Sequence, residues 1–173
     1  MTSPAAAFLV YGPTAAGKST YAQKLSAERN AVRVAVDEWM HGLFGDDKPE
    51  TMDFAWVMPR VARCQSRIWA SSVQILATGT DVVLEMGLLR ASDRDRMQSV
   101  VEDAGYRAAF CFVDADRLVR RQRALQRNVD RGDTYSFDVT PGMFDAMETI
   151  FEHPDTAELR RSQVITEEYT RAD

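Results

Sequence analysis

The stretch that decides the fold runs from Ala6 to Arg29 and reads AAFLVYGPTAAGKSTYAQKLSAER. Its first part, Ala6–Tyr11, is continuously apolar, which is typical of a strand buried on both faces. Helical periodicity begins at Lys18. Between this strand and this helix, the glycines of Gly12–Ser19 let the backbone curl so that successive N–H groups point inward. The positive end of the helix dipole also favours an anion there. The stretch therefore predicts a site for a polyphosphate between a strand and a helix.

The same turn fits the pattern G-x-x-x-x-G-K-[ST] at every fixed position, in the strand–turn–helix context that the pattern requires. In such a site Lys18 neutralises the β- and γ-phosphates, and the Ser19 hydroxyl completes a Mg²⁺ shell. A chance glycine turn before a helix is the alternative, which the context disfavours. The predicted nucleotide-binding residues are Gly12, Pro13, Thr14, Ala15, Ala16, Gly17, Lys18, Ser19 and Thr20.

Strand and helix patterns alternate along the rest of the chain. Further strands are predicted over 32–36, 81–85, 106–113 and 162–166, and further helices over 59–78, 92–104, 117–128 and 141–151. This alternation predicts an α/β fold with a central parallel sheet of about five strands, covered on both faces. Ligands of such sheets gather at the carboxyl ends of the strands.

Composition narrows the class of protein. The 173 residues contain no repeat or low-complexity linker, which favours one domain over 1–173. The net charge of −5 argues against a nucleic-acid or anionic-lipid partner. Two isolated cysteines indicate neither a disulfide scaffold nor a zinc site. No apolar run is long enough for a membrane span and no leader peptide is apparent, so we expect a cytoplasmic monomer or homodimer.

Together with the glycine-rich turn, three looser stretches resemble the small P-loop kinases: VDEW at 36–39, VVLEMG at 82–87 and the arginine-rich 120–128. This group includes chloramphenicol phosphotransferase, gluconate-type kinases, zeta toxins and polynucleotide 5′-kinases. The resemblance extends from Phe8 to about Phe151. It implies a P-loop NTPase three-layer sandwich with a small helical lid at about 120–140, and ATP and Mg²⁺ as cofactors.

Asp37 is the predicted catalytic carboxylate. In the resembled kinases an aspartate just past the second strand receives the proton of the attacking hydroxyl, and Asp37 occupies that place. Independently of the family, a carboxylate at a strand tip faces the γ-phosphate side of the cleft and can orient a hydroxyl for attack. The alternative is that Asp37 caps the helix that begins at Glu38.

Glu85 is the predicted metal residue beside Ser19. It ends the third strand, where the resembled kinases often carry aspartate, and a carboxylate there can hold a magnesium-bound water or contact the acceptor. The longer glutamate side chain leaves its distance to the metal open. A solvated carboxylate closing the strand is the alternative.

Arg120, Arg123 and Arg127 recur every three or four residues and so share one helical face. The resemblance implies that lid arginines cover the nucleotide and stabilise charge on the transferring phosphoryl group. Arg123 and Arg127 match these positions best, so the predicted catalytic set is Lys18, Asp37, Arg123 and Arg127. The alternative is a solvated basic face that pairs with nearby aspartates.

Aromatic and methionine side chains in 39–44 and 52–56 could wall an acceptor pocket or simply fill the core, and both interpretations stay open. The acidic connection 46–53 favours a neutral or cationic acceptor. Three arginines lie on one face of the next predicted helix: Arg60, Arg63 and Arg67. They either bind an acidic acceptor or form the solvent-exposed face of that helix.

The leading hypothesis is an ATP- and Mg²⁺-dependent phosphotransferase that moves the γ-phosphoryl group to a hydroxyl of a small-molecule acceptor, with antibiotics and sugar-like compounds in range. One alternative is a polynucleotide 5′-hydroxyl kinase. The acidic connection counts against it, as does Met40, which stands where the resembled enzymes supply an arginine. The other alternative is a nucleotide-binding switch or NTPase without an acceptor.

Overall fold

A central parallel sheet organises the computed structural model, which describes residues 4–49, 53–130 and 138–166. Its five strands are β1 (Ala6–Tyr11), β2 (Val32–Ala35), β3 (Val82–Glu85), β4 (Arg107–Val113) and β5 (Ser162–Ile165). They are ordered β2-β3-β1-β4-β5, and every neighbouring pair is parallel. The predicted α/β fold with about five parallel strands is therefore confirmed.

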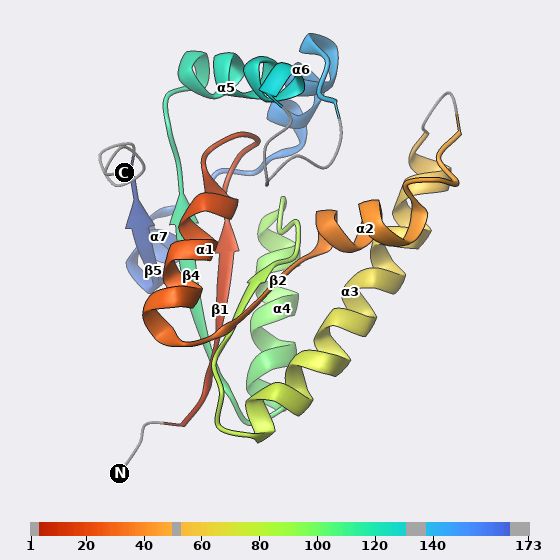
Figure 1. Cartoon of the computed structure of the whole chain (residues 1–173). Coiled ribbons are helices and arrows are strands. Elements are labelled where there is room, and N and C mark those ends of the chain that lie inside the picture. The colour runs from red at the N-terminus through yellow and green to blue at the C-terminus, as the bar shows by residue number, and fades with distance from the viewer. Residues whose placement is uncertain (1–3, 50–52, 131–137, 167–173) are drawn as a thin grey trace.

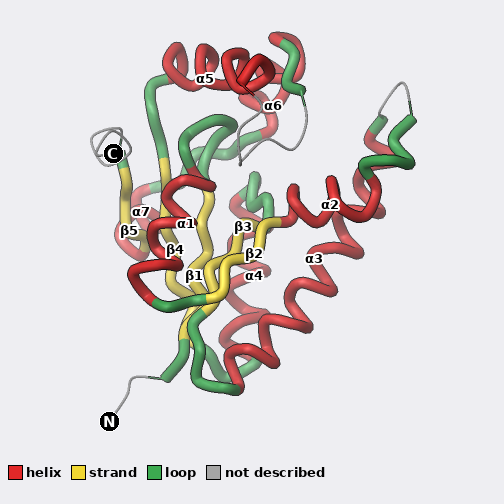
Figure 2. The backbone as a smooth tube through the Cα atoms, in the orientation of Figure 1, coloured by secondary structure: helices red, strands yellow, loops and turns green. Residues whose placement is uncertain are grey.

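Helices cover both faces of this sheet, as Figures 1 and 2 show. They are α1 (Lys18–Arg29), α2 (Val36–Phe44), α3 (Phe54–Ala77), α4 (Ala91–Asp103), α5 (Arg117–Asp130), α6 (Pro141–Ile150) and α7 (Thr156–Arg161). On one face, Tyr21 and Leu25 of α1 pack against the sheet. On the other, α3 contributes Ile68 and Leu76, and α4 contributes Val101. The three layers follow from burial of each amphipathic helix against an apolar sheet.

The helices α5 and α6 lie beyond the carboxyl ends of the strands, away from the two main cores (Figure 1). They enclose a small core of their own, formed by Ala124, Val139 and Phe144. Asn128 joins them, because its side chain both donates to the carbonyl of Val139 and accepts from the N–H of Val139, each at 2.9 Å. This region corresponds to the predicted lid at about 120–140, although residues 131–137 lie outside the described ranges.

Several element boundaries differ from the predictions. The second strand ends at Ala35, because Val36 already belongs to α2. The helix predicted over 59–78 begins at Phe54, since the Asp53 side chain accepts from the Trp56 N–H and caps a turn that precedes Pro59. The helix predicted from Ser92 begins one residue earlier, after Arg90.

The short helix α7 was missed by the sequence analysis. It begins with a capping box, in which Asp155 accepts from the N–H of Glu158 and the Glu158 carboxylate accepts from the N–H of Asp155. This pattern is visible in the sequence as Asp155–Glu158 after a proline. Within the described ranges, no helix is both long and apolar enough to cross a membrane.

Candidate functional site

The turn between β1 and α1 has the backbone of an anion-binding nest. At Gly12 φ is 152°, and a Cβ there would lie 1.9 Å from the Val113 carbonyl oxygen of β4, so the position accepts only glycine. Gly17, with φ 95°, leads directly into α1, and Ala15 between them also has a positive φ of 60°. Left-handed residues in such a turn form a concave row of N–H groups. A non-glycine residue held in this region is typical of functional sites.

The Lys18 side chain curls back over this turn. Its Nζ donates to the Pro13 carbonyl at 2.7 Å. Burial lowers the pKa of Lys18, whereas the carboxylates of Glu85 and Asp37 oppose that shift and Arg127 adds to it. A buried ammonium group is poorly solvated, so an anion that binds beside Lys18 would stabilise its charge.

Asp37 lies in the first turn of α2, at the carboxyl end of β2. The N-cap of α2 is Ala35, and the interpretation of Asp37 as a helix cap is wrong. Desolvation raises the pKa of Asp37, while the cations Lys18 and Arg127 lower it. Its side chain keeps contact with solvent, which moderates this effect. The structure thus brings Asp37, Lys18 and Arg127 within electrostatic reach of one another.

Glu85, at the end of β3, is held on both sides. Its Oε2 accepts from the Ser19 hydroxyl at 2.8 Å, and its Oε1 accepts from the Arg33 Nε at 2.8 Å. A second guanidinium nitrogen of Arg33 lies 2.6 Å from Oε1, and a third donates to Glu38 at 2.7 Å. Burial works against the Arg33 cation, but Glu85 and Glu38 outweigh it and raise the pKa of Arg33.

The sequence analysis missed Arg33. It stands between Val32 and Val34 in β2, which pairs with β3. The sequence signal that could have singled it out is a charged residue within a run of β-branched residues. Its partner Glu85 is far away in the sequence, and only the strand order brings the two together.

The contact between Ser19 and Glu85 fits a magnesium site. Mg²⁺ prefers oxygen ligands, keeps several waters and is held by one or two protein side chains together with substrate phosphates. A hydroxyl and a carboxylate in direct contact match this donor set. Because both Glu85 oxygens are already hydrogen-bonded, the carboxylate is better placed to hold a water of the metal than the metal itself. Within the described ranges, no cluster of three His, Cys, Asp or Glu residues could hold a metal ion.

Arg127 approaches the nest from α5. Its Nε is buried and has no hydrogen-bond partner within the described part of the chain. The guanidinium interacts electrostatically with Asp37 and Lys18. A buried donor without a partner costs free energy, which an anion at this place would recover. Arg123 lies one turn earlier on α5 and is half-buried.

Arg120 connects α5 to the nest and to α6. It is 3% exposed, donates to the Thr14 carbonyl at 3.3 Å and forms a two-point ion pair with Glu148 of α6, one bond of which measures 2.8 Å. The hydrogen bond from Arg120 lowers the pKa of Glu148. Arg120 is thus an internal link, and Arg123 and Arg127 remain the two candidates for contact with phosphate.

The other predicted residues fall around this centre. Thr20 is exposed on the first turn of α1. Trp39, Met40 and Phe44 are partly buried against the main core. Arg60 lies over the Trp56 ring at 4.1 Å and the Phe44 ring at 5.5 Å. Met52 lies outside the described residues, and the side chain of Phe54 is not described.

Comparisons with known proteins agree with the fold described above. Residues 8–154 match the family model AAA_33, described as an AAA domain. No curated protein matches the chain in sequence.

Solved structures resemble the chain over nearly its full length. A candidate kinase from Chloroflexus aurantiacus J-10-fl has a TM-score of 0.75 at 19% identity, covering 99% of this chain and 93% of that chain. A gluconokinase from Sinorhizobium meliloti 1021 has a TM-score of 0.60 at 19% identity, covering 94% and 82%. The APS kinase CysC of Mycobacterium tuberculosis, solved with AMPPNP and APS, has a TM-score of 0.63 at 16% identity, covering 95% and 89%. These likenesses show the P-loop NTPase fold.

Proposed function

The chain belongs to the AAA_33 family of AAA domains, and on that premise we propose that it is a kinase that transfers the γ-phosphoryl group of ATP to a hydroxyl of a small molecule with the help of Mg²⁺. The observation that carries this proposal is the convergence of Lys18, Asp37 and Arg127 beside the nest. These residues come from three elements, α1, α2 and α5, of which α5 is far from the other two in the sequence.

Each of the three has a distinct task in phosphoryl transfer. Lys18 leaves the Pro13 carbonyl and neutralises the β- and γ-phosphate oxygens. Arg127, whose Nε is buried and has no partner among the described residues, donates to the phosphoryl group as charge spreads over its oxygens. Asp37 accepts a hydrogen bond from the attacking hydroxyl and fixes its direction.

The reaction then balances as a single displacement. The acceptor oxygen forms a bond to the γ-phosphorus while the bond from that phosphorus to the β–γ bridging oxygen breaks, so that ADP leaves. The hydroxyl proton passes to the Asp37 carboxylate. Desolvation raises the pKa of Asp37 although the residue is exposed, and this direction makes its carboxylate a better proton acceptor than an aspartate with the ordinary value.

Mg²⁺ fits the pair formed by Ser19 and Glu85, and when bound it would supply charge neutralisation for the phosphates. Arg33 holds Glu85 in the orientation that this contact requires.

We propose that the acceptor binds against α2 and the start of α3, beside Asp37. Arg60 lies there over the rings of Trp56 and Phe44, and its Nε is buried without a partner within the described ranges. Such a wall suits a compact, partly apolar compound. The names of two structural neighbours, gluconokinase and APS kinase, also indicate small acceptors.

A screen of hydroxyl compounds with γ-labelled ATP and Mg²⁺ tests the proposal. The wild-type protein should label at least one small alcohol, and Asp37→Asn should lose that labelling. Asp103→Asn, which removes the same charge from an exposed position at the end of α4, is the matched control. Release of free phosphate that no acceptor changes would instead indicate a switch or NTPase. Labelling restricted to oligonucleotide 5′ ends would indicate a polynucleotide kinase.

A further inference from the structure

The strand β4 extends beyond its neighbour β5. Because β5 begins opposite Phe110, the first part of β4, Arg107–Ala109, has β1 on one side and none of the described strands on the other. The N–H of Asp114 donates to Ile165 of β5. Along a strand, every second residue presents its N–H and C=O groups to the same side. Ala108 is six residues before Asp114, so its N–H and C=O groups also point to the β5 side, where this part of β4 forms a free edge.

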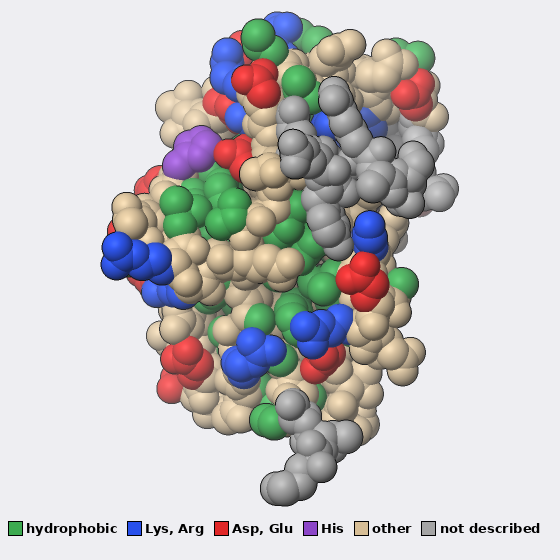
Figure 3. All heavy atoms as spheres, turned by 90° about the vertical axis from the view of Figure 1, so that its left-hand side faces the viewer, with side chains coloured by type: hydrophobic (Ala, Val, Ile, Leu, Met, Phe, Trp, Pro, Cys, Tyr) green, Lys and Arg blue, Asp and Glu red, His purple; other side chains and the backbone are tan. Residues whose placement is uncertain are grey.

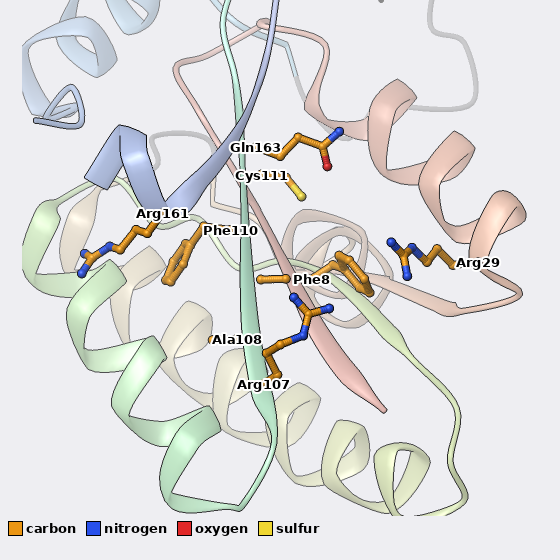
Figure 4. A pocket seen from close by; sticks show the side chains of 9 residues that line it. Phe8, Arg29, Arg107, Ala108, Phe110, Cys111, Arg161 and Gln163 are labelled. Carbon is orange, nitrogen blue, oxygen red and sulfur yellow. The ribbon is translucent and has the colours of Figure 1, made fainter. Parts of the chain in front are cut away.

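A pocket of about 220 Å³ surrounds this free edge (Figure 4). Phe8 lines it from the face that α1 covers, and Phe110 from the opposite face. Arginine side chains lie against both rings. The guanidinium carbons of Arg29 and Arg107 are 4.6 and 5.8 Å from the Phe8 centroid, and that of Arg161 is 5.7 Å from the Phe110 centroid.

The charges around this pocket are not balanced within the part of the chain that the structure describes. Arg161 pairs with Asp95 at 2.8 Å and lies near Glu158 at 3.7 Å. Arg29 and Arg107 form no hydrogen bond or ion pair with any described residue. On this side of the molecule, basic side chains stand beside exposed hydrophobic atoms (Figure 3).

The ordinary reasons for a surface cation explain only part of this arrangement. Arg29 is in the last turn of α1, where the helix dipole favours a positive charge. Arg107 begins a strand and has no such helix end, yet it lies over the same ring as Arg29. Both residues are exposed, so water weakens the repulsion between their charges, but an anion between them would be attracted by both.

We propose that this pocket binds a small organic anion, with a phosphate or carboxylate group between the exposed Arg29 and Arg107 and a flat apolar body over the partly exposed Ala109, beside the buried Phe8 ring. Both are contacts that this pocket provides: guanidinium donors for an anionic oxygen and an apolar floor for the body. A basic residue at a strand edge also discourages pairing with a further strand. The edge therefore favours a compact anion over an extended peptide.

This pocket is separate from the nucleotide site. Arg107 is the first residue of β4 and Arg29 the last of α1, so both lie at the amino-terminal end of the parallel sheet. The nest around Lys18 lies at the carboxyl end. A ligand of the pocket would bind alongside a nucleotide without displacing it.

Calorimetric titration with phenyl phosphate, inorganic phosphate and phenol tests this inference. It is performed on Lys18→Ala, which removes the competing phosphate site, and on the wild-type protein. Binding of phenyl phosphate should persist in Lys18→Ala and weaken about tenfold in Lys18→Ala/Arg107→Gln and in Lys18→Ala/Arg29→Gln. Lys18→Ala/Arg160→Gln, which removes an exposed neighbouring charge, should bind as tightly as Lys18→Ala.

Phenyl phosphate should bind more tightly than inorganic phosphate or phenol, because it alone provides both the charge and the apolar body. The arginine Nε–H resonances of Arg29 and Arg107 should shift during the titration. The inference is overturned if Lys18→Ala abolishes binding, if the Arg107→Gln and Arg160→Gln changes have equal effects, or if an acidic peptide such as Glu-Ala-Glu-Ala binds where phenyl phosphate does not.

Discussion

Lys18 illustrates how a single residue can be unfavourable for the empty protein and necessary for the bound one. Burial lowers its pKa, so the charged side chain reduces the stability of the fold at neutral pH, and this cost is relieved as the lysine deprotonates at high pH. Lys18→Met should keep or raise the melting temperature and weaken Mg·ATP binding about 100-fold, the equivalent of one or two charge-assisted hydrogen bonds. Thermal unfolding and calorimetry measure the two effects, with the exposed Lys48→Met as control. A lower melting temperature with unchanged affinity would make Lys18 a structural residue.

Asp37 should affect turnover rather than binding. Asparagine keeps its shape but cannot accept a proton, so Asp37→Asn should lower kcat by about 10²- to 10⁴-fold and change the affinity for ATP little. Since the pKa of Asp37 is raised above the ordinary 3.8, the rate should rise with pH through a value above that figure, as the carboxylate becomes free to accept the proton. A pH–rate profile of the wild-type enzyme measures this limb. Equal losses of ATP affinity and turnover in Asp37→Asn would contradict the proposed role.

At the scale of elements, the helices and strands whose bounds depend on residues adjacent in the sequence could be predicted. The helix predicted from Lys18 to about Arg29 is confirmed as α1, because the glycine turn and the helical period are both local signals. The start of α3 was misplaced because Pro59 resembles a first-turn proline, whereas the Asp53 cap lies further upstream. Arg33 could not be assigned to Glu85 from local patterns, since their contact depends on β2 lying beside β3.

Asn128 clamps the junction of α5 and α6. Asn128→Ala removes both hydrogen bonds to Val139 and should destabilise this region by about 1–3 kcal/mol. Hydrogen exchange at the Val139 amide should accelerate, while amides in β1 and β4 keep their protection, because the small core of α5 and α6 is separate from the two main ones. Gln23→Ala, which removes an exposed amide side chain from α1, is a control that should leave the Val139 amide unchanged. Uniform acceleration across β1 and β4 would show that the clamp supports the whole fold.

At the scale of the whole molecule, one buried ion pair links distant parts of the chain. Arg94 is fully buried and contacts Glu158 of α7 at 2.6 Å and the carbonyls of Leu88 and Leu89 at 3.4 Å. Its guanidinium also lies 5.0 Å from the Tyr11 ring centroid. In the sequence Arg94 stands among charged residues at 93–96 and resembles the solvated side of a helix, so no local pattern could reveal its burial.

Removing one member of this pair should cost more than removing both. Arg94→Met leaves the Glu158 carboxylate buried without its partner and should lower the free energy of unfolding by about 3–5 kcal/mol at neutral pH, whereas Arg94→Met/Glu158→Leu should recover most of that loss. The hydrogen bond from Arg94 lowers the pKa of Glu158 below the ordinary 4.5. Its stabilisation is therefore present above 4.5 and disappears as the pH falls through the lower folded value. Urea unfolding at pH 7 and at a series of pH values below 4.5 should show a steeper acid loss for the wild type than for the double variant. Equal stability of the single and double variants at pH 7, or parallel acid profiles, would mean that the link between α4 and α7 contributes packing and not charge.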